Sequence, residues 1–100
     1  MKKIFQGDVL LIEDINLPVL VVSKDYFNQS GEIIACPIYK QGESGPLHID
    51  IGNAKNRGIV HCEKMKLFDM NARGFSKKDR ISMEKLIDIS DAIQGIFDYI

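Results

Sequence analysis

The sequence predicts a mainly β chain that ends in one α-helix, arranged as a small barrel that the helix seals. Two observations lead to this fold class. Short segments rich in β-branched residues, separated by turn-forming residues, fill the first 63 residues. After Ser82 the apolar residues change to helical spacing. A sheet and a helix with one apolar face each bury those faces against one another, which gives the sealed barrel.

Five short strands are expected before the helix. Residues 18–23 (PVLVVS) are the most apolar, so we expect a central strand buried on both faces and opened by Pro18. Residues 47–51 (LHIDI) alternate, which puts His48 and Asp50 on one face, where we expect His48 to be exposed to solvent. The other strands are expected at residues 8–13, 32–39 and 59–63, with turns at residues 26–31, 41–45 and 53–58.

One amphipathic helix of about 18 residues is expected at the end of the chain, with Ser82 as its N-cap. Acidic residues line the side opposite its apolar face. Gly95 is a weak point, because glycine inside a helix costs about 1 kcal/mol relative to alanine. The apolar residues at helical spacing are Met83, Leu86, Ile87, Ile93, Ile96, Phe97 and Ile100.

Length and composition are typical of one globular domain, which we place at residues 1–100. About 45% of the residues are apolar, which argues against disorder, and no apolar run is long enough to cross a bilayer. We therefore expect a soluble, cytoplasmic protein that does not enter a membrane. Cys36 and Cys62 are too few for a disulfide scaffold and lie in expected strands, so we expect buried free thiols.

Charge is distributed unevenly along the chain, although the net charge is only −1. Residues 64–80 carry six basic and two acidic side chains, and the segment after them is acidic. This middle segment is a candidate surface for phosphate groups, and the alternative is a solvated loop rich in lysine. No Cys-x-x-Cys or His-x-x-x-His spacing occurs, so we expect neither a metal nor a cofactor.

Six short motifs, taken in order along nearly the whole chain, carry a resemblance to a known family. They are GDV (7–9), PVLVVS (18–23) with DYFN and SG after it, CPI (36–38), PLHI (46–49), GIVHCE (58–63) and DMNARG (69–74). Together they resemble the MazF/PemK (Kid-like) toxins of type II toxin–antitoxin systems, and the last two motifs are similar to the Kid/PemK branch in particular.

The resemblance implies an SH3-like barrel, a homodimer, and an antitoxin partner whose acidic flexible segment lies over the toxin. It also implies a sequence-specific endoribonuclease that cuts single-stranded RNA and inhibits growth. In this family the 2′-hydroxyl of the RNA is the nucleophile and no metal takes part.

Such cleavage requires a base for the hydroxyl proton, an acid for the leaving 5′-oxygen, and a donor or cation for the charged phosphorane. His61 and Glu63 lie two residues apart on an expected strand, so they share one face while Cys62 points inward. They match positions where the Kid/PemK branch has a catalytic arginine and aspartate. We expect them to be the catalytic pair, and the alternative for His61 is a surface histidine without a role.

Three departures from the family pattern bear on activity. Leu17 stands where members carry an arginine that often acts in catalysis, and Tyr39 stands where they have threonine or serine near the phosphate. The loop at residues 14–17 is also much shorter than the Gly-rich loop of the family. Losing one catalytic donor typically costs about 10²-fold in rate or more.

Four other residues are candidates for holding RNA. Tyr39 offers a hydroxyl and a ring on which a base can stack, although it is alternatively a plain rim aromatic. Lys64 and Lys66 are the expected non-specific phosphate contacts, and Arg73 is a candidate for the missing cation.

Three functions therefore compete. The first is an active ribonuclease toxin. The second is a catalytically impaired homologue that binds a peptide or nucleic acid. The third is a gyrase poison like CcdB, which has the same fold and depends on a terminal Trp-Gly-Ile. The chain has no tryptophan and ends in FDYI, which disfavours the third.

Overall fold

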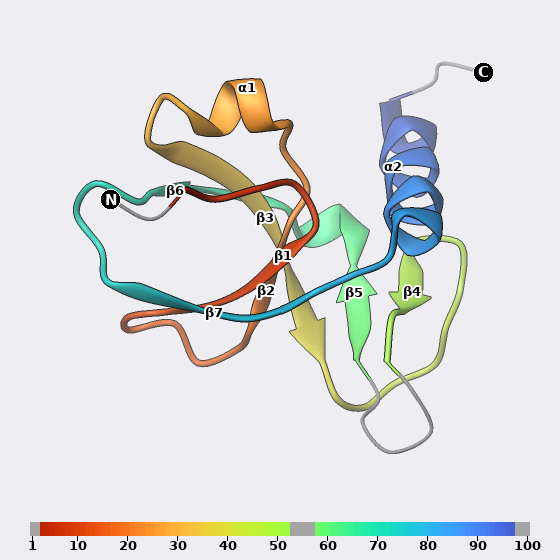
Figure 1. Cartoon of the computed structure of the whole chain (residues 1–100). Coiled ribbons are helices and arrows are strands. Elements are labelled where there is room, and N and C mark those ends of the chain that lie inside the picture. Colours follow the sequence, from red (N-terminus) through yellow and green to blue (C-terminus); the bar gives the residue numbers. More distant parts are fainter. Residues whose placement is uncertain (1–2, 53–57, 98–100) are drawn as a thin grey trace.

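The computed structural model describes residues 3–52 and 58–97. Its centre is the long strand β3 (Glu32–Tyr39), which pairs with other strands along both of its edges (Figure 1). One edge pairs with β2 (Val19–Val21). The other edge is divided between β6 (Lys66–Asp69), which faces the first half of β3, and β5 (Ile59–His61), which faces its last two residues.

The sheet has seven strands in the order β4-β5-β3-β2-β1-β7, with β6 as the additional partner of β3. All of the pairings are antiparallel, and the remaining strands are β1 (Asp8–Ile12), β4 (His48–Asp50) and β7 (Phe75–Arg80). The end strands β4 and β7 do not pair with each other among the described residues, so the barrel-like sheet is not closed. The predicted class, mainly β with a C-terminal helix, is confirmed.

Two apolar clusters occupy the two faces of the sheet, because successive side chains of a strand alternate. Leu20 belongs to the cluster beneath helix α2, whereas Val19 and Val21 belong to the opposite cluster. All three are buried, which confirms the prediction of a central strand buried on both faces. Ile89 packs α2 (Met83–Phe97) onto the cluster that contains Leu20, Val60 and Cys62.

The helix begins as predicted, since the Ser82 hydroxyl accepts a hydrogen bond from the Lys85 backbone N–H at 3.3 Å. Its buried side chains are Leu86 and Ile89, so Ile89 is a core residue that the predicted apolar stripe omitted. Among the stripe residues, Met83, Ile87 and Phe97 are exposed. The expected end of the helix at residues 98–100 lies outside the described residues, as does most of the expected turn at residues 53–58.

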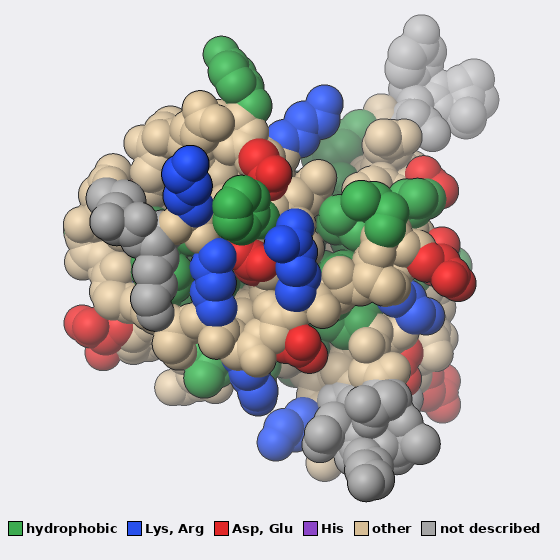
Figure 2. Space-filling view, viewed as in Figure 1, with side chains coloured by type: hydrophobic (Ala, Val, Ile, Leu, Met, Phe, Trp, Pro, Cys, Tyr) green, Lys and Arg blue, Asp and Glu red, His purple; other side chains and the backbone are tan. Residues whose placement is uncertain are grey.

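The basic segment at residues 64–80 contains two strands, β6 and β7, which the sequence prediction missed. Both present mostly exposed side chains, so they lack the apolar alternation that marks a strand. On β7 the cations have local partners: Lys77 lies 3.1 Å from the Asp8 carboxylate, and Lys77 and Arg80 both lie over the Phe5 ring. Figure 2 shows basic and acidic side chains together in the middle of this face, with no histidine visible.

A short helix, α1 (Asp25–Asn28), follows β2 at the position of the expected turn. Gly31 after it has φ +93°, and a Cβ there would collide with the Asn71 side chain. Within the described residues, no helix combines the length and apolar character needed to cross a lipid bilayer.

Two glycine substitutions should have opposite effects on stability. Gly31→Ala should lower the free energy of unfolding by about 1–3 kcal/mol, because alanine is strained in the left-handed backbone conformation and the Asn71 side chain has to move aside. Gly95→Ala should raise it by up to about 1 kcal/mol, since open space surrounds that helical position among the described residues. Urea denaturation followed by circular dichroism measures both, and equal effects of the two changes would contradict this local geometry.

Candidate active site

The hairpin of β4 and β5 places both histidines of the chain against one another. Its register sets His48 directly opposite His61, and their rings stack with centroids 3.9 Å apart and planes 19° apart. Both side chains are partly buried. The predicted solvent exposure of His48 holds in part, because its side chain is partly exposed but also stacks on His61 and contacts Glu63.

Glu63 reaches the histidines from a turn. The chain leaves β5 after His61 and forms a 3-10 turn, η1 (Cys62–Lys64), so the prediction that Glu63 continues the strand is wrong. The Cys62 side chain is fully buried, as predicted, and its backbone N–H donates to the Leu47 carbonyl at 2.9 Å. With Cys62 held in the core, Glu63 projects outward and its Oε2 lies 2.9 Å from His48 Nε2.

Tyr39 and Lys64 extend this cluster on the other side of His61. The Tyr39 and His61 ring centroids are 4.2 Å apart. Lys64 Nζ donates to the Tyr39 hydroxyl at 3.4 Å and lies 5.0 Å from the centre of the same ring. Tyr39 at the end of β3 therefore joins the histidine pair to the basic segment.

The electrostatics of the cluster favour proton acceptors. Desolvation, together with the charges of His48 and Lys64, lowers the pKa of His61 below its ordinary value. The hydrogen bond from His48 is the main cause that lowers the pKa of Glu63. The lowered pKa values favour the neutral form of His61 and the ionised form of Glu63. Nδ1 of His61 is buried and has no hydrogen-bond partner among the described residues.

Burial also determines the state of the two thiols beneath the site. It is the main cause that raises the pKa of Cys36 to about 12 and that of Cys62 to about 11. Cys36 Sγ lies 3.7 Å from the Cys62 carbonyl oxygen, and both cysteines are free. Their place is in the core, as predicted, and they are not nucleophiles.

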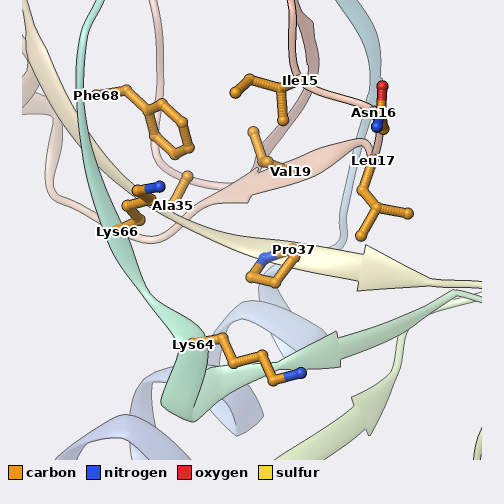
Figure 3. A pocket seen from close by; sticks show the side chains of 9 residues that line it. All are labelled: Ile15, Asn16, Leu17, Val19, Ala35, Pro37, Lys64, Lys66 and Phe68. Carbon is orange, nitrogen blue, oxygen red and sulfur yellow. The ribbon is translucent and has the colours of Figure 1, made fainter.

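A pocket of about 210 Å³ lies beside this cluster, between the loop after β1 and the start of β6 (Figure 3). Its surface is mainly apolar, with Leu17 at one side and Pro37 in the middle. Lys64 and Lys66 are its two basic lining residues, and the Lys64 ammonium contacts Tyr39. The two predicted phosphate contacts thus share one pocket with the shortened loop.

Arg73 lies away from the histidines. Its guanidinium is 5.9 Å from the centre of the Phe68 ring, which lines the pocket. In the part of the chain that the structure describes, no contact joins it to His48, His61 or Glu63. Arg73 therefore places its charge beside Phe68, at the edge of the pocket, and not beside His61 and Glu63.

The structure brings four of the predicted site residues together, namely Tyr39, His61, Glu63 and Lys64, and adds His48, which the prediction left out. A signal for His48 was available. Two expected strands that flank one turn form a hairpin, and a pairing centred on the expected turn aligns residue 48 with residue 63, two positions from its observed partner His61 and on the same face.

The sequence from residue 12 to residue 97 matches a family described as the PemK-like, MazF-like toxin of type II toxin–antitoxin systems. The chain belongs to this family. MazF-like toxins are generally endoribonucleases. No curated protein sequence gives a significant match to this MazF-like chain. The family assignment disfavours the CcdB-like alternative, as does the absence of tryptophan from the sequence.

Solved MazF structures share the fold. The Deinococcus radiodurans MazE–MazF complex (Form I) contains a chain similar at TM-score 0.84 and 16% identity, with 96% of this chain and 97% of that chain covered. An endoribonuclease in complex with its cognate antitoxin from a mycobacterial species gives TM-score 0.80 at 14% identity, covering 97% and 99%. The Mycobacterium tuberculosis toxin MazF-mt6 gives 0.73 at 13% identity, covering 93% and 99%. These likenesses support the MazF-like barrel seen here.

Proposed function

We propose that this chain is the toxin of a toxin–antitoxin pair and cuts single-stranded RNA, at a short sequence, through the 2′-hydroxyl of the RNA without a metal. One observation carries the proposal. His61 and Glu63 lie together beside Tyr39, and Lys64 connects this group to a pocket with two lysines. Proton-transfer groups next to phosphate-binding charge are what such a reaction needs.

The reaction moves one proton out of the nucleophile and one into the leaving group. The 2′-oxygen attacks phosphorus, the bond to the 5′-oxygen breaks, and a 2′,3′-cyclic phosphate and a 5′-hydroxyl result. His61 and Glu63 are the groups that accept and return the proton, with Glu63 positioned by its hydrogen bond to His48. The Tyr39 hydroxyl and the Lys64 ammonium are the nearest donors for the charged phosphorane.

The lysines offer a physical answer to the missing arginine at Leu17. Leu17, Lys64 and Lys66 line one pocket, so positive charge reaches it from β6 and η1 instead of from the loop before β2. In this proposal the phosphate backbone lies over the lysines and a base stacks on Tyr39. Arg73, beside Phe68, lengthens the positive track.

A second candidate is a binding module without turnover. It is favoured by Leu17, because an apolar side chain lines the pocket at the position of a family catalytic cation. In that case the lysine pocket binds nucleic acid or an acidic peptide, and the His–Glu cluster carries out no chemistry. The nuclease assay below separates the two candidates.

The folded protein should cut a long single-stranded RNA at defined sites in the presence of EDTA. His61→Ala and Glu63→Gln should each lower the rate at least about 10²-fold, because each removes a proton-transfer group. The double variant should be little worse than either single one, since the two residues act as a unit. Mapping of cut ends and detection of cyclic phosphate provide the readout.

Glu84→Gln is the matched control, because Glu84 is an exposed carboxylate in the first turn of α2. It should cut at the wild-type rate. Absence of cutting by the folded wild type would leave the binding module as the function, whereas cuts that need Mg²⁺ would refute the metal-independent mechanism.

Lysine substitutions should weaken RNA binding and reduce its salt dependence. On a His61→Ala background, which prevents cutting, Lys64→Ala and Lys66→Ala should each reduce the slope of log K against log salt by about 0.7. Fluorescence anisotropy with a labelled single strand measures this slope. Lys24→Ala, at an exposed position before α1, is the control and should leave the slope unchanged. Equal slopes for all variants would place the RNA elsewhere.

The proposed partners are a second copy of the chain and an antitoxin whose acidic flexible segment covers the lysine pocket, all in the cytoplasm. Exposed apolar side chains on α2, Met83 and Ile87, favour a partner on the helix. Sedimentation at micromolar concentration should give a dimer. The product of a neighbouring small gene with an acidic tail should bind this dimer and stop RNA cutting. A monomer, or a complex that still cuts, would contradict the respective part.

A further inference from the structure

The chain has two histidines, and the fold brings both to the same carboxylate. One ligand atom each from His48, His61 and Glu63 can be chosen so that all lie within 4.8 Å of one another. Two of these residues lie on facing strands and the third on a turn, so no short sequence spacing announces the group. This explains why the sequence prediction of no metal site did not detect it.

We propose that His48, His61 and Glu63 form a binding site for Zn²⁺, and that an ion bound there blocks RNA cleavage. Two histidines and one glutamate are a ligand set that zinc uses, with the fourth position left open. Bonds of 2.0–2.2 Å to a tetrahedral ion place ligand atoms about 3.4 Å apart. His48 Nε2 and Glu63 Oε2 are hydrogen-bond partners 2.9 Å apart, so an ion between them replaces this hydrogen bond and requires the two atoms to separate by about 0.5 Å. The His61 ring has to turn out of its stack on His48 so that the lone pairs of both rings meet at the ion.

Two further observations support this assignment. The Nδ1 atom of His61 is buried and has no hydrogen-bond partner among the described residues, so one nitrogen of the ring is not committed to another group. The side chains of His48 and Glu63 are 34% and 37% exposed, which leaves an ion a path from solvent. A single carboxylate with two imidazoles suits zinc much better than Mg²⁺ or Ca²⁺, which require more oxygen ligands.

Lys64 opposes the ion and provides a sharp test. Its charge acts on His61, so it also acts on a cation held by that ring. Removing it should strengthen zinc binding while weakening RNA binding, two changes of opposite sign from one substitution.

Zinc blocks RNA cleavage because it occupies the lone pairs of His61 and Glu63 that the reaction uses. This part of the inference rests on the proposed function. An ion held by His61 and Glu63 takes the same lone pairs that accept the proton of the 2′-hydroxyl. A protein loaded with zinc therefore has no free acceptor at the scissile bond.

Isothermal titration of the metal-free protein with Zn²⁺ alone tests the site. The wild type and Glu84→Gln should bind one ion per chain with equal affinity. His48→Ala and Glu63→Gln should each bind more than about tenfold more weakly, and Lys64→Ala several-fold more tightly. Glu63 is on the surface, so its variant remains informative if His48→Ala fails to fold. Equal affinity for wild type and Glu63→Gln would overturn the site.

Spectra with Co²⁺ decide which ligands are used. The complex should lack the intense ultraviolet band of a thiolate ligand, because Cys36 and Cys62 are fully buried in the folded protein. A thiolate band would overturn the assignment.

The nuclease assay tests the inhibition separately from the zinc site. Zinc should stop cutting by the wild type, and EDTA should restore it. Undiminished cutting by a zinc-saturated protein would overturn the inhibition while leaving the site. Zinc bound at this site in a chain that never cuts RNA would support the site and remove the proposed function.

Discussion

The burial of Cys62 is the constraint on which the site depends. A side chain with no exposed surface fixes the 3-10 turn against the sheet, and the hydrogen bond from its backbone N–H to the Leu47 carbonyl ties that turn to the neighbouring hairpin. The residues on either side then have to point away from the core. His61 meets His48 across the hairpin, and Glu63 meets the same ring from the turn. The positions of three polar side chains thus follow from one small apolar contact.

The position of the 3-10 turn η1 depends on how two strands, β6 and β5, pair with one edge of β3. β3 pairs with β6 through Glu32–Ala35 and with β5 through Ile38 and Tyr39, so Cys36 and Pro37 lie where the partner strand changes. Proline has no N–H to leave unpaired at such a gap. The chain between the two partner strands is η1, and Lys64 at its end enters the pocket that Pro37 lines. The break in the ladder therefore joins the charged pocket to the histidine pair.

Much of this arrangement could be predicted because local pattern and burial agree there. The apolar run at residues 18–23, the alternation at residues 47–51 and the cap at Ser82 each correspond to an element that buries an apolar face. The strands β6 and β7 escaped prediction because pairing partners, and not buried side chains, define them. His48 escaped for a related reason: its environment comes from cross-strand register, which a single strand does not encode.

The opposite charges of Glu63 and Lys64 determine which ligands the cluster favours. The carboxylate favours cations near the stacked imidazoles, while the ammonium on the far side of Tyr39 favours anions. In the proposed function, Lys64 and Lys66 attract a phosphate to the pocket, and Lys64 links that pocket to the Tyr39–His61 pair. In the proposed zinc site, the negative Glu63 carboxylate attracts the cation instead. Under the two proposals, one cluster takes either an anionic substrate or a cationic inhibitor, and each excludes the other because both need His61.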